Sequence, residues 1–292
     1  MKRFRGDLSH WWGDALDSLE ELVASCAELG DLISRTNRAD TKLFTALDLL
    51  RTRSVQIGWE VHELASAGYA DGAFARWRTL HELAVVSEFL KQFGEDAATR
   101  YMEHVHISNR KVIREYNECS EQLGYARIPT ADIARSEETK ERLLSLYGAD
   151  FANDWGWAAG VPGVSGRSFL DLREATGYGH WKAHYGMANH AIHAGPHGVL
   201  FRLGHPINFE PRSLSGPSLV GIGTPVDTTA ISLMHTTFSF VSAVRTSFGG
   251  FECELEITSS IRFIAGLARE IGEQVLEMTH NIQAEFGRSD SC

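Results

Sequence analysis

The stretch ARWRTLHELAVVSEFL, residues 75–90, carries the strongest structural signal in the sequence. Its apolar residues recur every three or four positions and cover more than half of the circumference of a helix. A helix that is apolar on so many sides must be covered by neighbouring elements, so we expect a helix over residues 72–93 at the centre of a bundle, closed by Gly94. A more polar helix is predicted over residues 95–123, with an inward face that carries Met102, Val105, Val112, Ile113 and Tyr116.

The helical pattern continues on both sides of this central segment. Apolar residues at intervals of three and four predict further helices over residues 11–35, 40–66, 136–147, 168–176, 178–194, 225–248 and 255–286. Two stretches lack the pattern. FANDWGWAAGVPGVSG (151–166) predicts a loop anchored by Trp155 and Trp157. Residues 195–224 predict a long loop rich in Gly and Pro, in which SLVGIG (218–223) suits a hairpin.

The predicted fold class is therefore all-α: a helical bundle of about eight helices with a long Gly/Pro loop between the later helices. The chain has 292 residues, of which 43 % are hydrophobic, and this is enough for a sizeable core. We expect a single helical domain over residues 1–292, with its core in residues 12–123 and 168–286 and an irregular segment over residues 124–167.

The charge balance argues against a general nucleic-acid-binding protein. The formal net charge is −10, so the chain lacks the basic excess with which proteins neutralise duplex phosphates. Local basic groups occur, and they suit either an anion site or ion-paired helix faces. They are Arg51 with Arg53, Arg76 with Arg78, and Arg110 with Lys111 and Arg114. The sequence has no P-loop, dinucleotide-binding glycine pattern or G-x-S-x-G elbow, and we expect no cofactor.

The four cysteines lie far apart in the sequence and form no CxxC pair. This spacing indicates free thiols, as in a reducing compartment, and not a disulfide framework or a thiolate zinc site. The basic residues at the N-terminus are not followed by an apolar run, and no apolar stretch reaches the length of a membrane span. We therefore expect a cytoplasmic protein that makes no membrane contact.

The first polar cluster is RWRTLHE, residues 76–82, within the central predicted helix. Arg78 and Glu82 are four residues apart, so they share a face and can form an ion pair. One interpretation is that this buried pair ties the helix to a neighbour while His81 is hydrogen-bonded. The other is a ribonuclease site, in which Arg76 or Arg78 stabilises the phosphate charge and His81 transfers the proton.

The second polar cluster is a concentration of histidines around GHWKAHYGMANHAIH, residues 179–193. It comprises His180, His184, His190, His193 and, just beyond, His197. Imidazoles three or four residues apart on a helix can share a metal ion, although the helical Glu of an HExxH site is missing. Alternatively, His190 and His193 form a polar patch with Asn189 against the central helix.

Two Glu-x-x-His spacings suggest a separate metal hypothesis. They are Glu103 with His106 and Glu277 with His280. Two such motifs and two further helical glutamates, for which Glu60 and Glu82 are available, are the ligands of a di-iron carboxylate site in a four-helix bundle.

These segments resemble a bacterial family of helical proteins that is defined only as a domain of unknown function. Its members carry an Arg-x-x-x-Glu step on a central apolar helix, as Arg78 and Glu82 do here. They also carry a Tyr and, a few residues later, a His near the end of a later helix, which Tyr185 and His190 resemble. The resemblance covers about residues 40–200.

That family is in turn similar to HEPN-type helical domains, many of which are ribonucleases in toxin–antitoxin and phage-defence systems. Their signature is an Arg followed, after four to six residues, by a His, and Arg76 and His81 fit this spacing. The resemblance implies a catalytic site in which Arg76 and Arg78 bind the phosphate of the substrate and His81 acts as the general acid and base. The remaining residues that it implies for this catalytic site are Glu82, His190 and His193. HEPN sites are often completed across a dimer, so the resemblance also implies a homodimer.

Three hypotheses follow, and the sequence leaves open whether the protein is an enzyme. The first is a HEPN-like, metal-independent ribonuclease or a phage-defence or toxin effector, with RNA as its substrate and an antitoxin or another protein as its partner. The alternative is a non-enzymatic interaction or ligand-binding helical module in which Arg78 and Glu82 are structural. The second alternative is a metal-binding helical bundle that uses the histidines.

Overall fold

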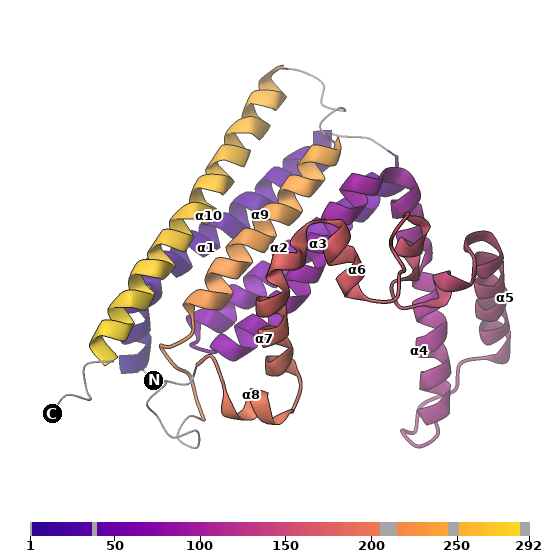
Figure 1. Ribbon diagram of the computed structural model, residues 1–292, viewed down its shortest axis with the longest axis horizontal. Coiled ribbons are helices and arrows are strands. Elements are labelled where there is room, and N and C mark those ends of the chain that lie inside the picture. Colours follow the sequence, from indigo (N-terminus) through magenta and orange to yellow (C-terminus); the bar gives the residue numbers. More distant parts are fainter. Residues whose placement is uncertain (1, 37–39, 205–214, 245–250, 287–292) are drawn as a thin grey trace. The chain divides into compact units, whose positions relative to one another are not determined.

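The computed structural model describes residues 2–36, 40–204, 215–244 and 251–286, and Figure 1 shows that they are organised as helices. No strand occurs in these ranges, which confirms the predicted all-α fold class. None of the helices described is long and apolar enough to cross a membrane.

The α-helices are α1 (Lys2–Thr36), α2 (Lys42–Ser66), α3 (Ala70–Glu103), α4 (Val105–Cys119), α5 (Thr130–Tyr147), α6 (Phe169–Ala175), α7 (Lys182–Ile192), α8 (Pro196–Leu200), α9 (Gly223–Val244) and α10 (Phe251–Phe286). Three short 3-10 helices are η1 (Ala149–Ala152), η2 (Gly156–Gly160) and η3 (Tyr178–Trp181).

The chain divides into two compact units. Unit 1 comprises Met1–Ala39, Leu47–Glu88 and His180–Cys292, and unit 2 comprises Asp40–Ala46 and Phe89–Gly179. The division between the units falls inside α2 and again inside α3. The single domain over residues 1–292 stays a prediction.

Unit 1 is built around three long helices, α1, α9 and α10, which pack against one another and lie side by side in Figure 1. Their buried positions carry large apolar side chains such as Leu19, Phe240 and Ile264. Helix α9 is unusual because many of its buried residues are Ser or Thr. The hydroxyl of Thr236 donates to the carbonyl of Ser232 one turn earlier, and such back-bonding satisfies a buried hydroxyl without a partner helix.

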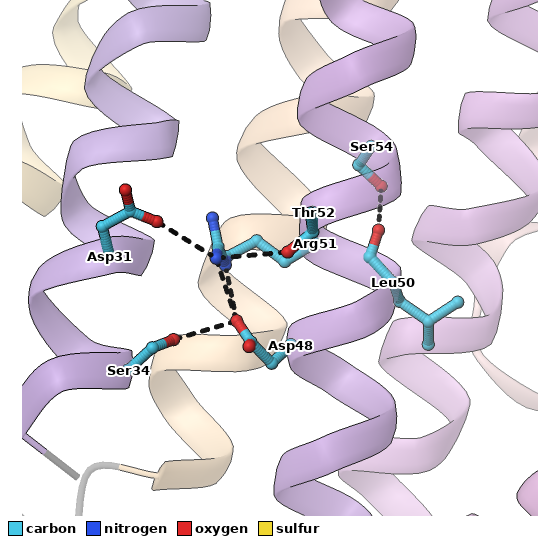
Figure 2. Close-up of polar contacts among 7 residues, drawn as sticks. All are labelled: Asp31, Ser34, Asp48, Leu50, Arg51, Thr52 and Ser54. Atoms are coloured by element: carbon cyan, nitrogen blue, oxygen red, sulfur yellow. Dashed lines mark hydrogen bonds and ion pairs between the residues drawn. The ribbon is translucent and has the colours of Figure 1, made fainter.

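A buried arginine joins α1 and α2 within unit 1, as Figure 2 shows. Arg51 is only 4 % exposed, and its guanidinium donates to Asp48 over 2.9 Å and lies 3.7 Å from Asp31. Ser34 donates to the same Asp48 oxygen over 3.0 Å. The guanidinium occupies the space left by the missing side chain of Gly30, because a Cβ there would lie 2.2 Å from Arg51 Cζ. The buried charge is thus paired, as such a charge must be.

The connection between α2 and α3 is short and spans residues 67–69. Gly68 has φ of +83°, a left-handed conformation that favours glycine. Its carbonyl accepts a hydrogen bond of 2.9 Å from the amide of Ser218, and a Cβ on it would meet Phe4 at 2.5 Å. Both the backbone conformation and the packing therefore require glycine here.

Unit 2 contains the predicted aromatic loop. Residues 151–166 are held by Trp157, which is buried and packs edge-on against Phe89 and Tyr101 with ring centroids 5.2 and 5.0 Å away. Arg100 donates to the carbonyl of Trp157 over 2.9 Å. The role predicted for Trp157 is therefore confirmed, although the segment includes η1 and η2 as well as loop.

The predicted helix over residues 95–123 differs from the structure in two respects. Gly94, with φ of +72°, produces a kink, but residues 95–103 continue as the last part of α3. A break follows at His104, whose buried ring donates from Nε2 to the carbonyls of Phe151 and Asn153 over 3.1 and 3.0 Å. Helix α4 begins only after this residue and has no buried side chain. The inward orientation predicted for Val105, Val112 and Tyr116 is wrong, since all three are exposed.

The region between α7 and α9 also departs from the prediction in part. Helix α8 lies within the stretch 195–224 that was predicted to be a loop. Residues 205–214 of that stretch lie outside the described part of the chain. Residues 218–223 are described and form no strand, so they do not make the predicted hairpin; instead α9 begins at Gly223.

Candidate functional site

Three consecutive residues of α3 reach three different neighbours within unit 1. Successive side chains on a helix are about 100° apart, so residues 76–78 point to different sides. Arg76 pairs with Glu60 of α2, and the indole of Trp77 donates to Ser232 of α9 over 3.0 Å. Arg78 reaches α7. The central position predicted for this helix is confirmed by these contacts.

Arg78 is the centre of a compact set of polar contacts, which we call the Arg78 cluster: Arg78, Glu82, Tyr185 and Asn189. Its Nη2 lies 2.9 Å from the carboxylate of Glu82 and donates to the hydroxyl of Tyr185 over 2.5 Å. Its Nε donates to Oδ1 of Asn189 over 2.5 Å. The Tyr185 hydroxyl in turn donates to Glu82 over 2.6 Å, and the guanidinium stands 4.7 Å from the centroid of the Tyr185 ring.

The Arg78 cluster is balanced in charge and partly open to solvent. One guanidinium faces one carboxylate, and the side chains of Arg78 and Glu82 are 26 % and 22 % exposed. Charge-assisted hydrogen bonds of this kind fix geometry as well as contributing energy, although solvent reduces the contribution. The arrangement suits a polar attachment of α7 to α3. Asn189, which was predicted to lie in a polar patch against the central helix, makes that contact through Arg78.

His81 lies beside this cluster but is enclosed. It is 1 % exposed, and its ring is 5.3, 5.9 and 5.9 Å from the rings of Trp77, Trp181 and Tyr185. A general acid or base must come within hydrogen-bonding distance of the substrate. Arg76, which the resemblance pairs with His81, instead faces α2 through Glu60. The structure therefore does not bring Arg76 and His81 together at an open surface.

The five histidines of the second sequence cluster are all exposed. The rings of His190 and His197 stack with centroids 4.0 Å apart, which joins α7 to α8. Tyr185 and Asn189, rather than His190 and His193, make the polar contact with α3. Within the described part of the chain, no three His, Cys, Asp or Glu side chains come together in a way that could hold a metal ion.

Three of the four glutamates of the di-metal hypothesis have other contacts, and Glu277 is exposed. Glu60 pairs with Arg76, and Glu82 binds Arg78 and Tyr185. Glu103 accepts a hydrogen bond of 2.5 Å from the hydroxyl of Tyr147. Burial and this contact raise the pKa of Tyr147 to about 12. These three carboxylates are thus engaged within their own units, and the geometry does not favour a di-iron site.

The basic groups noted in the sequence all lie near carboxylates, which favours the ion-paired interpretation over an open anion site. The pairs are Arg51–Asp48, Arg53–Glu60, Arg76–Glu60, Arg78–Glu82, Arg110–Glu137, Lys111–Asp154 and Arg114–Glu118. A phosphate would have to compete with a carboxylate at each of these positions.

Asp227 is a further titratable residue near α7 that sequence reasoning missed. It lies near the start of α9, and burial raises the pKa of its carboxyl while the nearby His184 imidazole partly offsets the shift. The sequence offers little signal for it, because an Asp close to a helix N-terminus is ordinarily read as part of the helix start.

Helices α7 and α8 present a surface of distinctive composition. From Ala183 to Phe201 the sequence contains no Asp, Glu, Lys or Arg. Several large apolar side chains in this stretch are nevertheless exposed. They are Met187, Ile192, Val199, Leu200 and Phe201, the last with 71 % of its surface accessible. We call these side chains, together with the exposed histidines between them, the α7–α8 surface.

Residues 46–210 match a family of unknown function (DUF5677). The matched region is more than half of the chain and includes the Arg78 cluster and the α7–α8 surface, and the protein belongs to this family. The resemblance to a helical family of unknown function is thereby confirmed, whereas the similarity to HEPN-type domains stays a prediction. The chain matches no curated protein and no solved structure.

Proposed function

We propose that this protein is a non-enzymatic helical module that binds another protein through the α7–α8 surface. The observation that carries the proposal is that residues 183–201 include several exposed apolar side chains and contain no Asp, Glu, Lys or Arg. Depletion of charge with enrichment of Met and aromatic residues is typical of the centre of protein interfaces. RNA, in contrast, gains most of its affinity from cationic side chains, and this surface offers only histidines.

The Arg78 cluster has a defined role in this proposal, because α7 has little apolar attachment of its own. Ala188 is the only buried residue of α7. The helix is held instead by the hydrogen bonds from Arg78 to Tyr185 and Asn189, and by aromatic contacts of Trp181 with Trp77 and His81. The cluster therefore positions the α7–α8 surface, and it needs no catalytic role to account for its residues.

The test is a comparison of proteins retained by the tagged chain from cells that express it naturally. Phe201→Glu places a charge in the α7–α8 surface, and Phe263→Glu makes the same change at an exposed position of α10. We expect a partner that binds the wild type and Phe263→Glu but is lost, by at least about tenfold, with Phe201→Glu. The partner is then purified and its Kd measured for all three proteins. Equal Kd values for the two variants would refute the proposal.

A HEPN-like ribonuclease is the competing function for the same residues. It is favoured by the partial exposure of the Arg78 side chain, of which 26 % is accessible to solvent. Chelator-treated protein is incubated with total RNA and with tRNA, beside a folded His81→Ala variant. On our proposal neither protein cleaves RNA. Cleavage by the wild type that His81→Ala abolishes would instead establish the ribonuclease.

A further inference from the structure

A cavity of about 250 Å³ lies between α4 and α5 in unit 2, and we call it the α4–α5 cavity. Each helix lines it with residues three and four positions apart, which share one side of a helix. Those that matter for binding are Arg110, Ile113 and Arg114 of α4 and Ile133, Ser136 and Glu137 of α5. Arg127, from the connection over residues 120–129, also lines the cavity.

The lining of the α4–α5 cavity is more basic than acidic. It carries three arginines and two glutamates, Glu118 and Glu137, so its side chains bear one net positive charge. The chain as a whole has a formal net charge of −10 and repels anions in general. An anion that binds here must therefore be attracted locally, by the side chains of this cavity.

Arg110 is the arginine of this cavity that is most closely engaged with its own unit. It pairs with Glu137, which also accepts a hydrogen bond of 3.0 Å from Lys140. The hydrogen bonds from Arg110 and Lys140 lower the pKa of Glu137, so the carboxylate stays ionised and holds Arg110 towards α5. Arg110 therefore forms a fixed part of the cavity wall.

The other two arginines are available to a ligand. Arg114 lies 3.6 Å from Glu118, and because the two side chains are 57 % and 64 % exposed, the contact contributes little and can be exchanged. Within the described part of the chain, the side chain of Arg127 has no hydrogen-bond or ion-pair partner. Asn117 fixes the backbone next to Arg127, because its side chain accepts a hydrogen bond of 2.9 Å from the amide of Ile128. A phosphate at this end of the cavity therefore meets little competition from carboxylates.

The cavity also offers apolar surface and a hydroxyl group. Ile113 is partly exposed and Ile133 is 36 % exposed, so both can contact the apolar part of a ligand. Ser136 is partly exposed and supplies a hydroxyl donor. The volume lies just below the usual range of small-molecule sites, so the cavity admits only a small ligand.

A phosphate monoester suits these donors better than a carboxylate does. It carries about −1.5 to −2 charges at pH 7 and three acceptor oxygens, which match Arg114, Arg127 and the hydroxyl of Ser136. We infer that the α4–α5 cavity binds a small phosphate monoester. Arg114 and Arg127 bind its phosphate, and its apolar body lies against Ile113 and Ile133. The inference goes beyond the proposed function and is independent of it, since the α7–α8 surface belongs to unit 1.

The first test is titration calorimetry of the full chain with phenyl phosphate in a low-salt buffer. Arg127→Gln removes a guanidinium from the cavity, and Arg135→Gln makes the same change of charge at an exposed residue of α5 that does not line it. We expect the first variant to weaken binding by at least about tenfold and the second by less than about twofold, both with the helix content of the wild type. A wild type that does not bind phenyl phosphate at millimolar concentration, an unchanged Kd for Arg127→Gln, or equal losses in the two variants would overturn the inference.

The second test compares ligands to identify the chemical class. Inorganic phosphate lacks the apolar body, and benzoate lacks the phosphate, so we expect each to bind at least about tenfold more weakly than phenyl phosphate. Ile133→Ser should weaken the binding of phenyl phosphate more than that of inorganic phosphate. Equal binding of inorganic phosphate would indicate a site for the free anion, and equal binding of benzoate would indicate a site for carboxylates. A phosphotyrosine peptide that binds more tightly than phenyl phosphate would place the monoester on a protein. Each of these three results contradicts the inference.

Discussion

Two arginines in unit 1 show how the same chemistry can serve different parts of a structure. Arg51 and Arg78 each sit on a long helix and each bind a carboxylate within one helical turn, at 2.9 Å in both cases. Arg51 is 4 % exposed and fits into the space above Gly30, between α1 and α2. Arg78 is partly open to solvent and binds α7.

The difference lies in what each arginine holds. The Arg51 side chain is buried between α1 and α2, and its guanidinium also lies 5.5 Å from the ring centroid of Phe240 on α9. Its loss should therefore affect the folding of unit 1 as a whole. The Arg78 cluster attaches a short helix that has little other burial, so its loss should release α7 while the long helices remain folded.

Gly30→Ala should have the largest effect on stability. The new Cβ would lie 2.2 Å from Arg51 Cζ, so the guanidinium must leave its place and break its contacts with Asp48 and Asp31. We expect a loss of about 2–4 kcal/mol in the free energy of unfolding, in the range for disrupting a buried ion pair. Urea denaturation followed by circular dichroism measures this loss.

Gly6→Ala is the matched control on the same helix. Nothing lies within 4 Å of a Cβ at Gly6, so alanine should stabilise α1 by about 0.5–1 kcal/mol through its helix propensity. The double variant Gly30→Ala with Arg51→Met isolates the clash, because the shorter uncharged side chain can move aside. If Gly30→Ala costs as much in the Arg51→Met background as alone, the clash is not the cause of the loss.

Glu82→Ala should have a smaller and more local effect. It removes the carboxylate that binds Arg78 and Tyr185, and because the pair is more than one-fifth exposed we expect a cost of about 1–2 kcal/mol. Hydrogen exchange should show loss of protection in α7 with little change in α1 and α10. The exposed i,i+4 pair Arg269–Glu273 is the control, and Glu273→Ala should cost less than about 0.5 kcal/mol. Equal costs for the two variants would contradict a positioning role for the Arg78 cluster.

The same comparison shows what the sequence could predict of the fold. The apolar pattern of residues 75–90 predicted a central helix correctly, because a helix that is apolar over more than half of its circumference must be covered by its neighbours. The pattern failed at α4, where Val112 and Tyr116 are exposed. Periodicity shows which side of a helix is apolar, but it does not show whether another element of the chain covers that side. The break at His104 was also missed, because it depends on contacts with carbonyls about 50 residues away.

For the candidate site, the sequence could predict the local pair but not its surroundings. The spacing of Arg78 and Glu82 was sufficient to predict an ion pair, since residues four apart share a helix face. The contacts from Tyr185 and Asn189 join positions more than a hundred residues apart, and spacing carries no information about them. Arg51 was recognised only as part of a basic cluster, because burial of its guanidinium depends on the absence of a side chain at Gly30 on another helix.

Asp227→Asn should have the smallest effect, and its sign depends on pH. Burial raises the pKa of this carboxyl above its ordinary value of 3.8, so the folded protein binds the proton more tightly than the unfolded chain does. The stability that the carboxyl contributes is therefore complete below pH 3.8 and decreases as the pH rises through the raised pKa.

Asparagine has no charge to bury, so we expect the variant to have a higher Tm than the wild type at pH 7. The difference should shrink as the pH is lowered through the raised pKa, because the wild-type carboxyl then becomes protonated. Asp17→Asn, on the exposed face of α1, should leave Tm nearly unchanged at both pH values. A lower Tm for Asp227→Asn at pH 7 would mean that the attraction between Asp227 and His184 outweighs the cost of burying the carboxylate, and that α9 contributes to holding α7 in place together with the Arg78 cluster.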